Sequence, residues 1–323
     1  TFCRIFEKMD KTMVDKYIRP DFLKAGDTIG VVAFASVVSQ QQKLSRWREI
    51  FESWGLKVKE SDHLYDSYVG ELSAPDKDRA SDFMKFLLDD EIKAIISFRG
   101  GYGSMRTLSI MDFEQIKNHP KWIVGFSDIT ALHCAIQKCG VESILGSMPS
   151  TILKFGEEPN NPDLAKSVES LRCALFGEEQ KFDAKPHKYN RPGVASGRLV
   201  GGNLTLFRSA VGTKYENHLD EDSILLLEDV DEVLYVIDRK MLSLQEGGFF
   251  SRAKGIIIGQ FTDTQREEVW GCSAYDLIND YMSKLDIPVA FGFSSGHEHP
   301  NYSLYLGREV KFVVDEEGSR LEF

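Results

Sequence analysis

Short apolar runs alternate with amphipathic segments over the first 139 residues, and this alternation constrains the fold more than any other feature. The run Asp27–Ala35 is almost wholly apolar, as is typical of a strand buried on both faces. Apolar side chains then recur every three to four positions over residues 40–54, which predicts a helix. The cycle repeats with a strand at 56–59, a helix at 75–89 and a strand at 92–98. The pattern predicts a parallel sheet covered by helices.

The amino-acid composition changes between about residues 155 and 192, where glycine, proline and acidic residues surround one helical pattern at 163–175. We interpret this region as a connector between two domains, which a length of 323 residues favours. The predicted limits are an N-terminal extension at 1–20, an α/β domain at 21–155, the connector at 156–192 and a C-terminal domain at 193–323.

Strands and helices resume after Val194. Strands are expected at 197–200, 223–227, 255–258 and 288–291, with helices at 203–211, 232–245 and 273–284. The tail from residue 304 predicts antiparallel strands around Gly318. The second domain is therefore expected to be mixed α/β.

Charge and cysteine content exclude several classes of function. The formal net charge of −11 argues against nucleic acid as the main partner. The five cysteines contain no CxxC pair, so neither a zinc site nor a disulfide framework is indicated, and a reducing compartment is favoured. No apolar run is long enough to span a membrane. We expect a cytoplasmic protein without a metal ion or another cofactor, and with neither nucleic acid nor membrane as a partner.

Ser127 stands where an apolar strand ends and a helix is expected to begin. A serine on such a bend exposes its hydroxyl beside free backbone N–H groups, which suits a nucleophile. The alternative is an ordinary helix cap, with Asp128 favoured there by the helix dipole. The order Gly-Phe-Ser-Asp-Ile is not the Gly-x-Ser-x-Gly motif of the α/β-hydrolases, so that motif does not decide between them.

The segment Arg99–Ser104 places three glycines in four residues between a predicted strand and a predicted helix. Such a backbone can approach a ligand closely and point N–H groups at an anion. It could equally be a tight turn or the cradle of a nucleotide phosphate. Because it precedes Ser127 by one βα unit, both loops should open at the same carboxyl edge of the sheet.

Two later segments place a carboxylate and an imidazole at predicted strand ends. Glu228 closes an apolar run, although the acids that follow it are ordinarily a solvated helix start. His297 and His299 flank Glu298, but a metal site is a weak interpretation because no HExxH helix is present. A histidine beside a carboxylate is instead what a general base for a serine requires.

Taken in series, six motifs resemble the LD-carboxypeptidases, the muramoyl-tetrapeptide carboxypeptidase family that includes the microcin C immunity peptidases. The resemblance runs from about residue 21 to 310. Its motifs lie at 23–33, 99–103, 125–133, 201–204, 227–232 with 237–239, and 296–301. Two positions depart from the family pattern, with Tyr305 in place of a proline and Ala33-Phe34-Ala35-Ser36 in place of Ala-Pro-Ser.

The resemblance implies a flavodoxin-like N-terminal domain that supplies the serine, and a smaller mixed α/β domain that supplies the rest of a Ser-Glu-His triad. In this comparison Ser127 corresponds to the nucleophile, His297 to the general base and Glu228 to the residue that orients it. The backbone N–H groups of Asp128 and Gly101 would form the oxyanion hole. The remaining candidates, all for substrate binding, are Arg99, Gly100, Tyr102 and Asn203.

Family members are typically cytoplasmic homodimers that remove the terminal D-alanine from recycled murein tetrapeptides. The resemblance therefore implies cleavage of the L,D bond that follows meso-diaminopimelate. A microcin-immunity activity on aminoacyl-nucleotide analogues needs an aromatic side chain to stack on the base, and residues 155–192 contain no tryptophan. A nucleotide-binding phosphotransfer protein that uses residues 99–103 and a peptide-binding protein without catalysis remain as alternatives.

Overall fold

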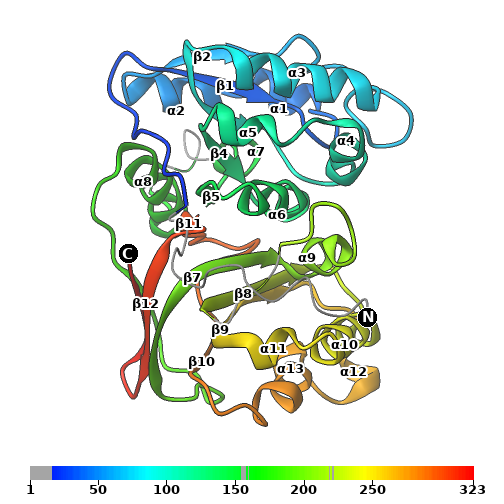
Figure 1. The fold of residues 1–323 in the computed structure, drawn as a ribbon, viewed down its shortest axis with the longest axis vertical. Helices are drawn as coiled ribbons and strands as arrows, with labels where there is room; N and C mark the ends of the chain where they lie inside the picture. Colours follow the sequence, from blue (N-terminus) through cyan, green and yellow to red (C-terminus); the bar gives the residue numbers. More distant parts are fainter. Residues whose placement is uncertain (1–16, 154–157, 159, 218, 220–221) are drawn as a thin grey trace, which may run out of the picture.

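The computed structural model describes residues 17–153, 158, 160–217, 219 and 222–323. Most of the predicted extension at 1–20 and part of the predicted connector therefore lie outside the described residues. Two α/β units lie end to end along the longest axis of the molecule (Figure 1). Across the described part of the chain, no helix combines the length and apolar character needed to cross a membrane.

The first unit is built on a six-stranded sheet with the order β11-β5-β4-β3-β1-β2. Its five parallel strands are β1 (Thr28–Val32), β2 (Lys57–Glu60), β3 (Ile92–Ser97), β4 (Trp122–Gly125) and β5 (Ser143–Leu145). The helices of this unit are α1 (Gln40–Leu44), α2 (Trp47–Ser53), α3 (Asp76–Leu88), α4 (Ser104–Ile110), α5 (Gln115–Asn118) and α6 (Thr130–Lys138). The predicted parallel sheet is confirmed, and its 2-1-3-4-5 order is flavodoxin-like.

The single helix predicted over 40–54 is wrong, because the chain leaves the helical conformation at Ser45. Ser45 has an extended backbone, with φ −73° and ψ 163°. Its hydroxyl donates to the carbonyl of Gln42 at 2.6 Å. A local side-chain bond of this kind competes with the helical ladder, and periodicity does not reveal it.

Apolar side chains cover both faces of the first sheet. On one face Val32 packs in a cluster with Phe83 and Phe86 of α3. On the other, Ile29 belongs to a cluster with Phe51 of α2. Burial on both faces explains why the predicted strands read as continuous apolar runs.

The second unit is a seven-stranded mixed sheet with the order β10-β9-β8-β7-β12-β13-β6. Its strands are β6 (Phe182–Ala184), β7 (Gly193–Asn203), β8 (Ser223–Val230), β9 (Ala253–Thr262), β10 (Val289–Phe291), β12 (Glu309–Asp315) and β13 (Gly318–Glu322). Its helices are α9 (Leu204–Ala210), α10 (Leu234–Glu246), α11 (Phe249–Arg252), α12 (Glu267–Trp270) and α13 (Ala274–Met282). The predicted hairpin at Gly318 is confirmed as β12 and β13.

Sheet membership does not follow the predicted domain limits. Strand β11 (Leu304–Leu306) pairs antiparallel with β5 of the first sheet, although the sequence assigns it to the C-terminal domain. Strand β6, from the predicted connector, pairs with β13 of the second sheet. The connector also contributes α8 (Pro162–Phe176), and α7 (Pro149–Ile152) precedes it. The domain limits themselves stay a prediction.

Tyr305 lies on β11, at the joint between the two units. Its hydroxyl donates to the carbonyl of Ala174 at 2.9 Å, and the Arg308 guanidinium lies 3.4 Å from its ring centroid. Arg308 also donates to the buried Glu142 carboxylate at 2.6 Å. The departure from the family proline therefore gives the joint an aromatic ring that packs under a buried ion pair.

Candidate active site

Ser127 occupies a strained turn at the carboxyl end of β4. Its φ is +61°, a left-handed value that residues with a side chain rarely adopt. One turn of 3₁₀ helix, Ser127–Ile129, then leads into α6. A Cβ at Gly125 would lie 2.7 Å from Ile129 Cγ2, so this tight return depends on glycine before the serine. Strain of this kind is concentrated at functional sites.

His133 binds this turn from the buried side. The ring is fully buried, with Nε2 2.8 Å from the carbonyl of Gly125 and Nδ1 2.8 Å from Ser143 Oγ. Burial lowers the pKa of His133 to about 4, so the ring is neutral and its Nε2–H donates to Gly125. The sequence by itself gave no indication of a role for His133. A histidine within the otherwise apolar start of a helix was the signal that could have identified it.

The glycine turn lies directly against Ser127. A Cβ built on Gly100 would lie 3.1 Å from Ser127 Cβ, 3.3 Å from Ser127 Oγ and 3.2 Å from the Asp128 nitrogen. On Gly101, with φ +101°, a Cβ would instead collide with Ser36 Oγ. The two loops thus meet at one edge of the sheet, as expected for successive βα units.

Arg99, Ser36 and Tyr102 fix the outer side of this turn. Arg99 Nη1 donates to the carbonyl of Val37 at 3.2 Å, which links the loops after β3 and β1. The Tyr102 N–H donates to Ser36 Oγ at 2.9 Å, while the Tyr102 side chain is exposed. Ser36, which ends the segment that departs from the family pattern, therefore supports the turn. The substrate-binding roles of Arg99 and Tyr102 stay predictions.

Glu228 and His297 form a hydrogen-bonded pair from the second unit. Glu228 lies near the carboxyl end of β8 with its side chain 1% exposed, and its Oε2 is 2.8 Å from His297 Nδ1. This bond leaves Nε2 of His297 to exchange a proton. The imidazole packs against the Phe126 ring at a centroid distance of 4.9 Å, which brings the pair to the residue before Ser127. Proton transfer between Ser127 and His297 stays a prediction.

The environment of His297 favours a charged imidazolium. Burial by itself disfavours the charge, but the hydrogen bond and negative charge of Glu228 outweigh burial and raise the pKa of His297 above its usual value. Asp229 and Asp263 act in the same direction. A base with such support is suited to accepting a proton from a hydroxyl.

Asn203 is engaged within the protein. Its amide Nδ2 donates to Asp229 Oδ1 at 2.9 Å, and its Oδ1 accepts from the Leu206 N–H as the cap of α9. Its own N–H donates to Thr130 Oγ1 at 3.0 Å, across the junction of the two units. These bonds give Asn203 a role in holding the carboxyl ends of β7 and β8, and its role in substrate binding stays a prediction.

The two neighbours of His297 in the His-Glu-His motif have partners elsewhere. His299 Nδ1 lies 2.7 Å from Ser167 Oγ on α8. The backbone N–H of Glu298 donates to Gln260 Oε1 at 2.8 Å. The pattern in the sequence therefore does not produce a convergent set of metal ligands here.

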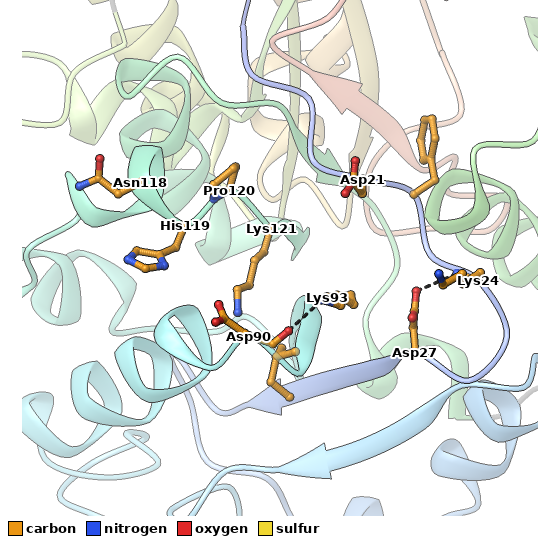
Figure 2. A pocket seen from close by; sticks show the side chains of 11 residues that line it. Asp21, Lys24, Asp27, Asp90, Lys93, Asn118, His119, Pro120 and Lys121 are labelled. Carbon is orange, nitrogen blue, oxygen red and sulfur yellow. Dashed lines mark hydrogen bonds between the residues drawn. The ribbon is translucent and has the colours of Figure 1, made fainter.

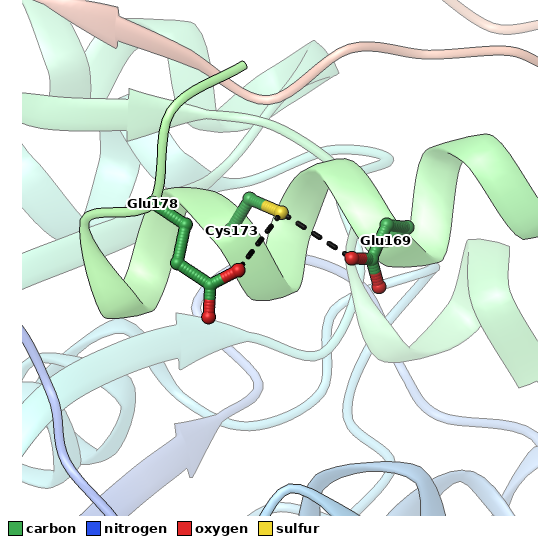
Figure 3. Close-up of side chains that lie close together, drawn as sticks. All are labelled: Glu169, Cys173 and Glu178. Atoms are coloured by element: carbon green, nitrogen blue, oxygen red, sulfur yellow. Dashed lines mark hydrogen bonds between the residues drawn. The ribbon is translucent and has the colours of Figure 1, made fainter.

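Within the described ranges, one group of possible metal ligands comes together, formed by Glu169, Cys173 and Glu178 around α8 (Figure 3). Arg172 already bonds both carboxylates, at 2.8 Å and 2.6 Å. Burial, reinforced by the two acids, raises the pKa of the Cys173 thiol to about 12. A protonated thiol beside neutralised carboxylates is a poor metal site.

Two cavities lie at opposite edges of the first sheet. One, of about 310 Å³, borders His297 and Phe126. The other, of about 660 Å³, lies at the amino ends of the strands and is lined by Asp27, Asp90 and Lys121 (Figure 2). Burial lowers the pKa of Lys121 to about 8, and its ammonium donates to the carbonyl of Phe86. Of these two cavities, the smaller one adjoins the predicted general base His297.

Comparison with known proteins gives consistent matches over nearly the whole chain. Residues 29–146 match the LD-carboxypeptidase N-terminal domain and residues 196–312 match the LD-carboxypeptidase C-terminal domain. A probable murein peptide carboxypeptidase of Bacillus subtilis is 34% identical over 312 residues, 94% of each chain. The microcin C7 self-immunity protein MccF of Escherichia coli is 27% identical, over 91% of this chain and 92% of its own.

A solved structure has the same two-domain fold. The muramoyltetrapeptide carboxypeptidase of Oxalobacter formigenes superposes with a TM-score of 0.79 at 25% identity, covering 91% of this chain and 97% of its own. The predicted fold class and family are both confirmed. The chain is a serine peptidase that belongs to the LD-carboxypeptidase family.

Proposed function

We propose that this enzyme hydrolyses the L,D amide bond between meso-diaminopimelate and the terminal D-alanine of murein tetrapeptides. The observation that carries the proposal is the Glu228–His297 pair, which packs through Phe126 onto the strained turn of Ser127. The relationship to a probable murein peptide carboxypeptidase supports the choice of substrate.

In the proposed acylation step, His297 Nε2 accepts the hydroxyl proton of Ser127 while Oγ attacks the carbonyl carbon of the scissile bond. The C–N bond then breaks, and His297 returns the proton to the amine of the departing D-alanine. Glu228 keeps Nε2 directed at the reacting atoms and stabilises the imidazolium. Water, activated by the same histidine, hydrolyses the acyl-enzyme and releases the tripeptide.

The oxyanion of the tetrahedral intermediate would be held by the N–H groups of Asp128 and Gly101. The close approach of Gly100 to the Asp128 nitrogen supports this assignment, because no side chain separates the two backbone segments. One such donor contributes about 3–4 kcal/mol to the transition state in acyl transfer. Arg99, Tyr102 and Asn203 are proposed to line the path to the substrate carboxylate.

The experiment is mass-spectrometric detection of D-alanine release from L-Ala-γ-D-Glu-meso-diaminopimelate-D-Ala. Wild-type protein is expected to release D-alanine and Ser127→Ala to release none. Equal release by the variant would remove Ser127 from the mechanism. Absence of release by both would reject the murein substrate.

Cleavage of an aminoacyl-nucleotide analogue is a second candidate, favoured by the relationship to the microcin C7 self-immunity protein. The same assay decides between them when an aspartyl-nucleotide analogue is run beside the tetrapeptide. The phosphotransfer alternative is not proposed, because the chain belongs to the LD-carboxypeptidase family. A homodimer in the cytoplasm remains part of the proposal, and light scattering of the purified protein tests the dimer.

A further inference from the structure

Asp128 and Ser104 are joined by two hydrogen bonds between buried groups. The Ser104 N–H donates to Asp128 Oδ2 at 2.8 Å, and the Ser104 hydroxyl donates to the carbonyl of Asp128 at 2.5 Å. Ser104 is fully buried and Asp128 is 4% exposed. Both the carboxylate and the carbonyl of Asp128 therefore bind the same residue, 24 positions earlier in the chain.

These bonds connect the two backbone segments that approach Ser127. Asp128 directly follows Ser127, and Ser104 begins α4 directly after the glycine turn. Within that turn, a Cβ on Gly100 would lie 3.2 Å from the Asp128 nitrogen. Glycine-rich backbone has many accessible conformations, so its distance from Asp128 must be fixed by contacts outside the turn.

Buried Arg79 fixes the turn from its other side. Its Nη1 donates to the carbonyls of Gly103 at 3.0 Å and Phe34 at 2.9 Å. A Cβ on Gly103 would lie 2.6 Å from the same Nη1, so the position before α4 cannot carry a capping side chain. The cap is supplied by Asp128 instead, which couples the start of α4 to the Ser127 turn.

Burial of the Asp128 carboxylate in this position has a desolvation cost. Burial raises the pKa of Asp128, while the two hydrogen bonds from Ser104 and the positive charge of Arg79 oppose that rise. Taking an acid out of water is unfavourable unless its hydrogen bonds are made. Replacement of Ser104 by alanine would therefore remove the hydroxyl that binds the Asp128 carbonyl and leave the carboxylate with the N–H of residue 104.

We propose that the Asp128 carboxylate and Ser104 are positioning residues that set the spacing between the two N–H donors of the oxyanion hole. The proposal rests on the function proposed above. Loss of either group would displace the donors relative to Ser127 without removing them. A displacement of about 1 Å costs on the order of 10²-fold in rate.

The test compares Asp128→Ala, Asp128→Asn and Ser104→Ala with wild type. The first readout is the rate at which a fluorophosphonate labels Ser127, followed by intact-protein mass, which requires no knowledge of the peptide. In this reaction Ser127 Oγ bonds to phosphorus and fluoride leaves. The second readout is kcat and KM for D-alanine release.

Asp82→Asn is the matched control. Asp82 is 5% exposed, lies at the middle of α3, and accepts hydrogen bonds from the N–H and Nδ1 of His63, at 2.9 Å and 3.0 Å. It is expected to lower the unfolding temperature while leaving both rates at the wild-type level. It therefore reports what loss of a buried carboxylate does by destabilisation alone.

Asp128→Ala and Ser104→Ala are expected to lower the labelling rate and kcat by about 10²-fold with little change in KM. Asp128→Asn keeps an oxygen that accepts from the Ser104 N–H, so it should recover part of the loss. Wild-type labelling rates in both alanine variants, or equal losses in Asp82→Asn, would overturn the proposal. Failure of Ser127→Ala to lower peptide cleavage would instead reject the nucleophile, and this inference with it.

Discussion

Replacement of Gly100 by alanine would place a methyl group between the glycine turn and Ser127. On the observed backbone, the new Cβ lies 3.1 Å from Ser127 Cβ, 3.2 Å from the Asp128 nitrogen and 3.3 Å from Ser127 Oγ. Ordinary contacts between such atoms are about 3.5–4.0 Å. The turn and the serine must therefore separate by a few tenths of an ångström.

The cost to folding is moderate and the cost to catalysis is large. Overpacking of a tight site costs about 1–3 kcal/mol. Gly100 has no left-handed φ, so alanine can adopt its backbone conformation. Because alanine also restricts the unfolded chain, it offsets about 0.4–1 kcal/mol of this loss in stability. The net loss in unfolding free energy is then about 0–2.6 kcal/mol. Displacement of an oxyanion donor should lower kcat by about 10²-fold or more.

The assay is kcat/KM for D-alanine release, combined with the urea midpoint of unfolding. Gly255→Ala is the control, since a Cβ there would lie 2.8 Å from Phe312 Cδ1 within the core of the second sheet. It should destabilise the protein without lowering kcat of the folded fraction. A Gly100→Ala variant with wild-type kcat/KM would refute the assignment of this turn to the catalytic site.

Three further predictions concern buried ionisable groups. Glu228→Gln removes the charge that raises the pKa of His297, so the acid limb of the pH–rate profile should move to lower pH. The same variant should lower kcat by about 10⁴-fold. An acid limb that does not move in a pH series would contradict this prediction. His133 stays neutral with a pKa of about 4, so about 3 kcal/mol of stability should be lost as pH falls from about 6.5 to 4, because the unfolded chain binds the proton first. Denaturant titrations of wild type and His133→Gln at both pH values measure this, and equal losses would exclude His133 as the cause. Arg308→Met leaves the half-exposed Arg19 as the ion-pair partner of the buried Glu142 and should lower the free energy of unfolding by about 3 kcal/mol. The double variant with Glu142→Gln should regain most of this stability. A double variant as unstable as the single one would contradict the charge argument.

Local sequence was sufficient for most strands and helices, because burial on both faces of a parallel sheet requires continuous apolar runs. It failed at Ser45, where one hydroxyl bond interrupts an otherwise periodic helix. It also identified Ser127 as a residue on a bend, and the observed φ of +61° agrees with that prediction.

Local sequence could not predict which polar side chains bind each other in the fold. Glu228 and His297 are 69 residues apart, and the sequence alone offered several acids and two histidines for the pair. Asp229 lies next to Glu228 but binds Asn203, and His299 lies two residues from His297 but binds Ser167. Adjacent positions on a strand point to opposite sides, which separates Asp229 from Glu228 on β8. His297 and His299 lie on a bent segment outside any strand, where no regular alternation applies.

The sequence by itself determined the alternation of strands and helices, the family and the residue types available for catalysis. Those properties depend on periodicity and on short motifs, which are local. Tertiary structure decided that β11 joins the first sheet, that the Tyr305 hydroxyl binds the Ala174 carbonyl, and that Asp128 binds Ser104. These contacts join segments far apart in the chain, and they depend on how strands, helices and loops pack together rather than on any local pattern.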